Sequence, residues 1–317
     1  MMGKVGGNRN FGFGKRMDWA GKNALADRYG NGHYATRAAH TERWGRFVTY
    51  AKAEGIKDAR DVTQELIAVY GRELADEVRS GDMAVAYAQN LLSSVNVVLE
   101  ALRGDQQMRV SPAAVVGQRM NVRSTAPAGM ERSQVSQAAK TLQNKGDERV
   151  AAVAELARDL GLRFREASLL DVRSALIEAK ALGKINITEG TKGGRGREVD
   201  RWIPISQQAL HSLEKGASIQ EKERNLIPLE MRFDQWRDYA NAAWRSASHD
   251  YDLAGFHNLR AAYACDRYQQ LTGYAAPVIS HHRMAEKTED QVARQIISHE
   301  LGHSRIEVVA AYVGSAK

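Results

Sequence analysis

One segment of the sequence differs in pattern from the residues on either side of it: ALGKINITEGTKGGRGREVDRWIPI, residues 181–205. Ile185 and Ile187 alternate with polar residues, a glycine-rich turn follows, and Trp202-Ile203-Pro204-Ile205 closes the segment. An alternating run, a turn and a second apolar run are typical of an antiparallel β-hairpin. Because the flanking residues have helical spacing, the sequence predicts a mainly α fold with a small antiparallel β-sheet, an α+β protein.

Apolar stripes with helical spacing predict two helical regions. Before residue 104, such stripes follow Thr36 and Thr63 and run from about 84 to 102. Proline and glycine interrupt the pattern between 104 and 130, and helical spacing resumes near Ser133. We therefore expect four parts: a flexible basic arm (1–29), a helical domain (30–104), a linker (105–130) and a second domain (131–317).

Composition narrows the class of protein. The 317 residues hold 45 Lys and Arg against 38 Asp and Glu, a net charge of +7, which is common in proteins that bind polyphosphate. The single cysteine, Cys265, cannot form an intramolecular disulfide, and no apolar run is long enough to cross a membrane. The first residues lack the apolar core of a signal peptide, so we expect a cytoplasmic protein.

Basic residues gather in the arm, the linker and the glycine-rich turn. Those in the arm lie among six glycines within residues 1–22, a composition that predicts a flexible segment able to contact phosphates. A solvated terminus without a ligand is the alternative interpretation. The candidate DNA-binding residues are Lys4, Arg9, Lys15, Arg16, Arg119, Arg123, Arg195 and Arg197.

Four short motifs follow one another in the second domain. They are Gly161-Leu162-Arg163-Phe164-Arg165-Glu166, Gly190-Thr191-Lys192-Gly193, His257-Asn258-Leu259-Arg260 and Leu301-Gly302-His303, and Tyr312 comes nine residues after the last of them. In this order and spacing they resemble the catalytic set of the tyrosine recombinases, the family of phage and mobile-element integrases. The resemblance covers residues 30–317.

The residue types suit phosphodiester chemistry. Arg163 and Arg260 offer planar guanidinium forks that match two phosphate oxygens, and Tyr312 is a candidate nucleophile. Lys192, in the turn of the hairpin, is a candidate general acid for the leaving oxygen, although Lys184 on the same sheet is an alternative. Histidine suits proton transfer near neutral pH, which is the part expected of His257 and His303.

The resemblance implies a helical core-binding domain followed by a catalytic domain. It implies cleavage and rejoining of DNA through a 3′-phosphotyrosyl intermediate by Arg163, Lys192, His257, Arg260, His303 and Tyr312, with Glu166 supporting Arg163. No nucleotide cofactor and no metal take part. The expected partners are double-stranded DNA attachment sites, three further copies of the chain in a homotetramer, and accessory DNA-bending proteins, but no membrane. Such proteins are encoded by bacteria or phages.

Other functions stay open at this stage. The same chemistry serves type IB topoisomerases and enzymes that resolve hairpin ends, and a catalytically inactive DNA-binding regulator could share the fold. His299-Glu300-Leu301-Gly302-His303 is also an H-E-x-x-H motif, the signature of zinc hydrolases. The longer form of that motif needs Gly and His where Ile306 and Val309 stand, which argues against zinc. The DNA site, the direction of recombination, the use of Tyr312 in cis or in trans and the role of the 274–287 loop are left open.

Overall fold

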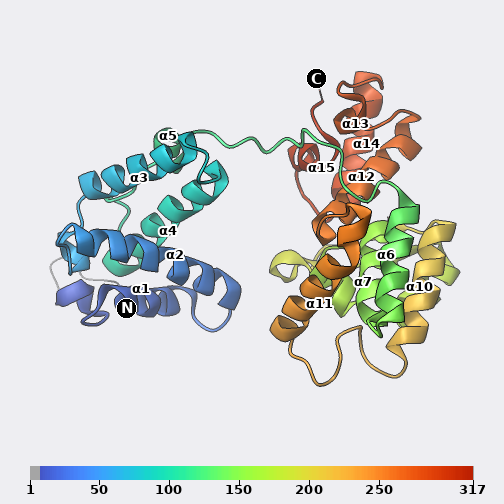
Figure 1. Cartoon of the computed structure of the whole chain (residues 1–317), viewed down its shortest axis with the longest axis horizontal. Coiled ribbons are helices and arrows are strands. Elements are labelled where there is room, and N and C mark those ends of the chain that lie inside the picture. Colours follow the sequence, from blue (N-terminus) through green and yellow to red (C-terminus); the bar gives the residue numbers. More distant parts are fainter. Residues whose placement is uncertain (1–7, 317) are drawn as a thin grey trace. The chain divides into compact units, whose positions relative to one another are not determined.

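The structure is a computed structural model that describes residues 8–316. The chain divides into two compact units, Met1–Met120 and Asn121–Lys317, and each is considered by itself (Figure 1). In the described part of the chain, helices dominate and two short strands form one antiparallel sheet. The expected α+β fold class is therefore confirmed.

Unit 1 is a bundle of helices around one apolar core. Trp44 and Phe47 of α2, Ile67 of α3 and Leu91 and Leu99 of α4 lie in this core and are almost fully buried. The elements are η1 (Arg9–Gly12), α1 (Met17–Tyr29), α2 (Tyr34–Ala53), η2 (Ala59–Asp61), α3 (Gln64–Arg79), α4 (Val85–Arg103) and α5 (Pro112–Val116). The helix expected after Thr63 is α3, and Thr63 caps it by accepting a hydrogen bond from the Leu66 N–H group at 3.1 Å.

The prediction of a flexible basic arm over 1–29 is wrong for residues 8–29. Met17 and Leu25 of α1 are buried in the core of unit 1, and the Trp44 indole N–H donates to the Met17 carbonyl at 2.9 Å. Helix α1 is therefore a structural part of the bundle. The pattern was hard to recognise because small residues such as Ala20 and Ala24 fill much of its buried face.

The expected linker, 105–130, is also narrower in the structure. Its first part belongs to unit 1, where Val116 of α5 joins the core. Its last part belongs to unit 2, where Arg158 donates hydrogen bonds to the carbonyl groups of Gly129 at 2.7 Å and Met130 at 3.1 Å. The boundary between the units falls at residues 120 and 121.

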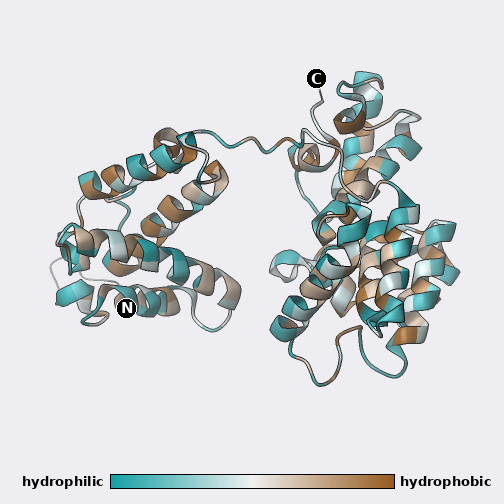
Figure 2. Ribbon diagram, viewed as in Figure 1, coloured by the Kyte–Doolittle hydropathy of each residue, from teal (hydrophilic) through white to brown (hydrophobic). Residues whose placement is uncertain are grey.

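Unit 2 packs ten α-helices of the described chain around a second core. Buried apolar residues from these helices form this core, and hydrophobic and hydrophilic residues alternate along the helices (Figure 2). The helices are α6 (Arg132–Asn144), α7 (Glu148–Leu160), α8 (Phe164–Leu169), α9 (Val172–Leu182), α10 (Gln207–Gln220), α11 (Phe233–Ser248), α12 (Phe256–Thr272), α13 (Pro277–Ser280), α14 (Lys287–Glu300) and α15 (Ala310–Val313). Three short 3₁₀ helices, η3 (Lys192–Arg197), η4 (His249–Tyr251) and η5 (Ile306–Val309), complete the list.

The hairpin expected at 181–205 forms. Strand β1 (Lys184–Asn186) pairs in antiparallel register with β2 (Trp202–Pro204), and Ile185 lies opposite Ile203. Both isoleucines are fully buried, so the inward face of the sheet packs on the core. The glycine-rich turn between the strands forms η3.

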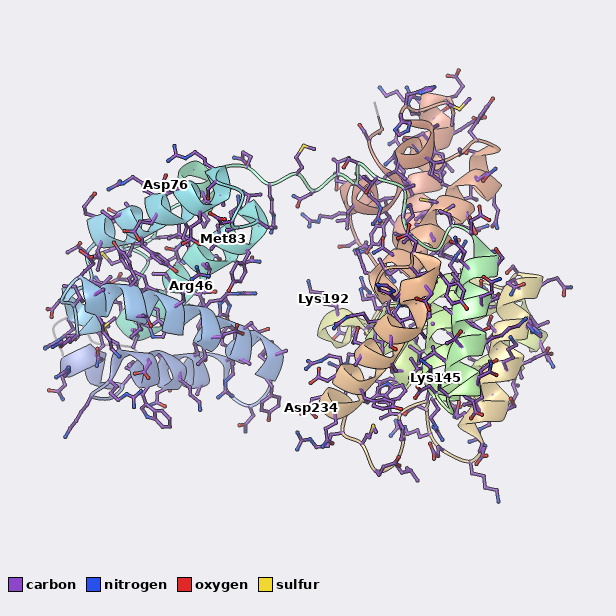
Figure 3. The ribbon with its side chains drawn as sticks, in the orientation of Figure 1. Arg46, Asp76, Met83, Lys145, Lys192 and Asp234 are labelled. Atoms are coloured by element: carbon purple, nitrogen blue, oxygen red, sulfur yellow. The ribbon has the colours of Figure 1, made fainter. Side chains whose placement is uncertain are left out.

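The outer surface of both units is polar. Asp76 of α3, Asp234 of α11 and Lys145 are exposed, and each is labelled among the side chains in Figure 3. Among the described helices, none is both long enough and apolar enough to cross a membrane.

Candidate active site

The connection from α7 to α8 places the first arginine of the site. Gly161 ends α7 in the left-handed conformation (φ 63°), which glycine adopts without strain. Arg163 then stands at the N-cap of α8, and its backbone N–H donates to Glu166 Oε2 at 2.8 Å. The carboxylate that caps this helix therefore also fixes the arginine that begins it.

The Glu166 carboxylate forms ion pairs with three arginines. It is fully buried, its Oε1 lies 2.5 Å from Arg163 Nη1 and 2.8 Å from Arg201 Nη1, and its Oε2 lies 3.5 Å from Arg260 Nη1. Burial would raise the pKa of this carboxyl group, but Arg201, Arg260 and Arg163 together lower it to about 2. Glu166 therefore pairs with Arg163 and with two further arginines.

Arg260 lies on α12, and its side chain is 1% exposed. Its Nη1 donates to the Gly161 carbonyl and its Nη2 to the Leu301 carbonyl, so the guanidinium joins the α7–α8 connection to the end of α14. Burial lowers the pKa of Arg260 to about 10, which leaves it charged at neutral pH. Two backbone carbonyl groups thus hold a buried cation in one orientation.

The Tyr312 hydroxyl lies against this cation. Tyr312, on α15, is 4% exposed, and its hydroxyl accepts a hydrogen bond from Arg260 Nε at 3.4 Å. The His303 Nε2 atom is 3.2 Å from the same hydroxyl. Both partners belong to the same chain as Tyr312.

His303 follows the turn that ends α14, where Gly302 has a φ of 66°. Burial and then the positive charges of Arg260, Arg163 and Arg201 lower the pKa of this imidazole to about 4. The ring is therefore neutral at pH 7. Because Arg260 Nη2, a donor, faces His303 Nε2 at 3.5 Å, we assign the lone pair to Nε2.

His257 lies beside Tyr312, and Arg123 contacts the helix that carries this tyrosine. The ring centres of His257 and Tyr312 are 5.4 Å apart. Although part of His257 is exposed, burial and the charges of Arg260, Arg123 and Arg163 lower its pKa. The Arg123 backbone N–H donates to the Ala310 carbonyl at 2.9 Å, which ties the segment after residue 120 to α15.

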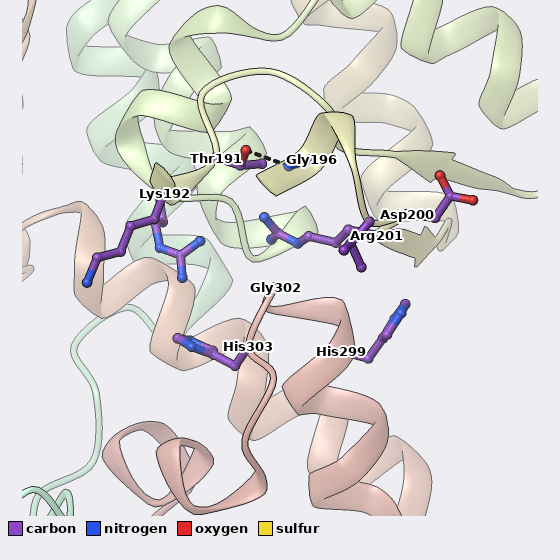
Figure 4. A pocket seen from close by; sticks show the side chains of 10 residues that line it. Thr191, Lys192, Gly196, Asp200, Arg201, His299, Gly302 and His303 are labelled. Atoms are coloured by element: carbon purple, nitrogen blue, oxygen red, sulfur yellow. Dashed lines mark hydrogen bonds between the residues drawn. The ribbon is translucent and has the colours of Figure 1, made fainter. Parts of the chain in front are cut away.

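The hairpin brings Lys192 to the same region. A pocket is lined by Arg163, Lys192, Arg201, Gly302 and His303, among others (Figure 4). The Lys192 side chain is exposed and therefore accessible to a ligand. The alternative, Lys184, instead places its amine 4.5 Å from the ring centre of Trp202 and does not line this pocket.

Sequence reasoning missed Arg201. It directly precedes β2, its side chain is 4% exposed, and it pairs with Glu166. A signal was present, because Arg201 is two residues before Ile203, and the alternation of the strand, continued by one residue, places it on the inward face. An arginine on the buried face of a short strand needs an acidic partner.

The structure describes the side chains of four other candidate DNA-binding residues, all in unit 1. In unit 1, Arg9 donates to the Lys57 carbonyl, Arg16 pairs with Asp18, and Lys15 and Arg119 are exposed. Of the candidates, Lys4 lies outside the described residues, as do the side chains of Arg195 and Arg197.

The H-E-x-x-H alternative does not fit the structure. Helix α14 ends at Glu300, so His299 and His303 do not share one helical face, and Figure 4 shows them pointing apart. Glu300 is buried and occupied by Arg267, at 2.9 Å, and by the Tyr263 hydroxyl, at 2.9 Å. Within residues 8–316, no group of three His, Cys, Asp or Glu side chains is placed to hold a metal ion.

A comparison with protein families finds a match over part of the chain. Residues 117–266 match the family model described as integrase, a segment that contains Arg163, Lys192, His257 and Arg260. No curated protein sequence matches the chain.

Solved structures share the fold. A lambda integrase (75–356) dimer bound to a COC′ core site is 19% identical with a TM-score of 0.57, over 93% of this chain and 95% of that one. The Tn1549 transposon integrase (82–397) in complex with circular intermediate DNA is 11% identical with a TM-score of 0.57, over 96% and 97%. A lambda integrase tetramer bound to a Holliday junction is 16% identical with a TM-score of 0.53, over 89% and 72%. The architecture is that of these DNA recombinases. The chain thus contains a segment that matches the integrase family model and shares its fold with these recombinases.

Proposed function

We propose that the protein is a site-specific DNA recombinase that cleaves and rejoins DNA through Tyr312. The observation that carries this proposal is the position of the Tyr312 hydroxyl, 3.2 Å from His303 Nε2 and 3.4 Å from Arg260 Nε, in a chain with the recombinase fold. A buried tyrosine held between a neutral imidazole and a cation can lose its proton and then act as a nucleophile.

The charges around the site favour a phosphodiester as substrate. The guanidinium groups of Arg163, Arg201 and Arg260 share the single carboxylate of Glu166, and Lys192 lines the adjoining pocket. The cluster therefore has an excess of positive charge, which an anionic group can neutralise. Arginine forks bind the nonbridging oxygens of a phosphate and stabilise the charge that they carry in the transition state.

The proposed cleavage replaces one phosphorus–oxygen bond with another. The Tyr312 oxygen attacks phosphorus while the bond from phosphorus to the 5′-oxygen of the next nucleotide breaks, which leaves a 3′-phosphotyrosyl bond and a 5′-hydroxyl group. The Tyr312 proton passes to His303 Nε2, and Lys192 supplies a proton to the departing 5′-oxygen. Attack by a 5′-hydroxyl from another strand reverses these steps and rejoins the DNA, so the chemistry needs neither a nucleotide cofactor nor a metal ion.

His257 has a separate place in this scheme. Its contact with Tyr312 is between ring centres 5.4 Å apart, whereas His303 meets the hydroxyl itself. We therefore assign the first proton transfer to His303 and propose that His257 contacts the phosphate or shuttles protons from the solvent-exposed side.

The proposed partners are two double-stranded DNA attachment sites and three further copies of the chain. Support comes from the relatives, since lambda integrase has been solved as a dimer on a core site and as a tetramer on a Holliday junction. An integration or excision role fits the similarity to a transposon integrase. In this proposal, accessory proteins bend the DNA between sites, unit 1 serves as the core-binding domain and unit 2 as the catalytic domain.

A covalent-trapping assay tests the proposal. Wild type and Tyr312→Phe are incubated with nicked DNA that carries a candidate attachment site, with EDTA present. The proposal predicts an adduct that survives SDS for wild type and none for Tyr312→Phe. If wild type binds the site but forms no adduct, the protein is a DNA-binding regulator on this fold instead.

A further inference from the structure

Backbone hydrogen bonds hold Arg201 at the end of the sheet, directly before β2. Its backbone N–H donates to Asn186 Oδ1 at 2.8 Å, and its carbonyl accepts from the Ile187 N–H at 3.1 Å. These bonds to β1 and to the residue after it fix the start of β2. The side chain leaves the sheet on the same face as Ile203 and enters unit 2, where it is almost completely buried.

The guanidinium then contacts two other elements. Its Nη1 lies 2.8 Å from Glu166 Oε1 on α8, and its Nε donates to the Glu300 carbonyl, the last of α14, at 2.7 Å. The Arg201 side chain also covers Gly302, where an added Cβ would lie 3.0 Å from Arg201 Cδ. One side chain thus joins the hairpin to the carboxylate that holds Arg163 and to the turn that carries His303.

The positive charge of Arg201 has consequences for both neighbours. Among the positive charges that lower the pKa of Glu166, that of Arg201 has the largest effect. It also contributes to the low pKa of His303. The buried Nη2 atom has no hydrogen-bond partner in residues 8–316, which is uncommon for a buried polar group.

We propose that Arg201 is a positioning residue of the cleavage reaction. It holds Arg163 and His303 in fixed positions relative to the hairpin that carries Lys192. This inference rests on the proposed function. Its guanidinium is buried against Glu166 Oε1 and the Glu300 carbonyl, so in this proposal it acts through Arg163 and His303 and not on the substrate itself. Because the fork must reach a carboxylate and a backbone carbonyl at once, lysine cannot replace it fully.

The test compares Arg201→Met and Arg201→Lys with a matched control, Arg267→Met. Arg267 also pairs with α14, through the Glu300 side chain, but it does not line the pocket. Single-turnover formation of the covalent adduct is measured from about pH 3.5 to pH 9, a range that includes the pKa of His303, with thermal unfolding of each variant. A misplacement of catalytic groups by about 1 Å can cost on the order of 100-fold in rate, and we expect a loss of this size for Arg201→Met.

The pH profile separates positioning from simple destabilisation. The charged groups that face His303 are Arg163, Glu166, Arg201 and Arg260. Loss of the Arg201 charge raises the pKa of both Glu166 and His303, so the acidic limb of the profile moves to higher pH in Arg201→Met. Arg201→Lys keeps the charge and thus keeps the limb near that of wild type, although its rate is lower. Arg267→Met leaves the limb in place.

Titration of His303 by NMR provides a readout that does not depend on cleavage. We expect the pKa of the His303 imidazole to rise from about 4 in Arg201→Met and to change little in Arg267→Met. Wild-type rate and an unchanged acidic limb in Arg201→Met, or an equal shift in Arg267→Met, would overturn the inference. Absence of an adduct in wild type would refute the proposed function, and the titration would still decide whether Arg201 acts on His303.

Discussion

Burial and crowding of positive charge keep the site histidines neutral, and this has a measurable effect on stability. His303 has a pKa of about 4 in the folded protein, whereas an unfolded histidine has one of about 6.5. Above pH ~6.5 both states are neutral and the group has no effect. As the pH falls from ~6.5 toward 4, only the unfolded chain gains the proton, so the free energy of unfolding decreases.

We therefore predict that His303→Gln weakens the pH dependence of the stability of unit 2 between about pH 6.5 and 4. The measurement is the urea midpoint at each pH, followed by hydrogen exchange of α12 peptides. His211→Gln, which changes an exposed histidine on α10, is the control and should keep the wild-type slope. An identical slope in wild type and His303→Gln would contradict the account.

The Glu166 carboxyl group affects the stability of the folded protein at lower pH. Its pKa is about 2 in the folded protein and ~4.3 when unfolded, so its stabilising effect is complete above pH ~4.3 and is lost as the pH falls through 2. The pairing with Arg163 was predictable from a spacing of three residues at a helix start. The pairing with Arg201 was not, because 35 residues of chain and a strand register separate the two.

Two glycines at helix ends offer a test at the scale of elements. Gly161 after α7 and Gly183 after α9 have nearly equal φ values, 63° and 65°. A Cβ on Gly161 would lie 2.4 Å from Tyr263 Cδ1, whereas none of the described atoms lies within 4 Å of one on Gly183.

We predict that Gly183→Ala costs about 1 kcal/mol through the left-handed backbone alone. Gly161→Ala costs about 2–4 kcal/mol, because overpacking against Tyr263 adds to that strain. Gly161→Ala also slows adduct formation, since the Gly161 carbonyl holds Arg260. Denaturant unfolding measures the change in the free energy of unfolding for each variant. Equal changes would contradict the close contact between Gly161 and Tyr263 of α12.

A second pair of glycines tests whether α1 belongs to the bundle. Gly21 of α1 faces Trp44, and an added Cβ would lie 2.3 Å from the indole Nε1, whereas Gly45 of α2 has no described atom that close to its Cβ position. We predict that Gly21→Ala destabilises unit 1 by about 1–3 kcal/mol. Gly45→Ala stabilises it by about 0.5–1 kcal/mol through helix propensity. Thermal unfolding of both variants is the measurement, and stabilisation by both would contradict the packing of α1 on α2.

At this scale the sequence predicted the elements with strong periodicity and missed those without it. The alternation around Ile185 and the apolar stripe of α2 were sufficient to place a hairpin and a helix. Helix α1 was not predicted, because glycine and basic residues dominate the neighbouring sequence and alanines fill the buried face of the helix. Composition alone therefore favoured a flexible arm.

The whole-molecule prediction concerns which chain supplies the nucleophile. In the structure, Tyr312 reaches Arg260 and His303 of its own chain, which favours cleavage in cis. We predict that a mixture of Tyr312→Phe and Arg163→Ala forms no more adduct than either variant alone. A mixture of wild type and Tyr312→Phe should form adduct in proportion to the wild-type fraction. Recovery of cleavage in the first mixture would show that the tyrosine acts in trans. The sequence could not settle this point, because it depends on the path of the chain from His303 to Tyr312.

The most direct test of the central claim is to locate the covalent bond. Adduct formed on a nicked attachment site is digested with nuclease and trypsin, and the peptides are analysed by mass spectrometry. The account predicts a nucleotide, joined through its 3′-phosphate, on residues 306–317, the peptide that follows Arg305. Fragmentation should place it on Tyr312, the only tyrosine in that peptide. A nucleotide on any other residue, or an adduct of the same yield in Tyr312→Phe, would contradict it.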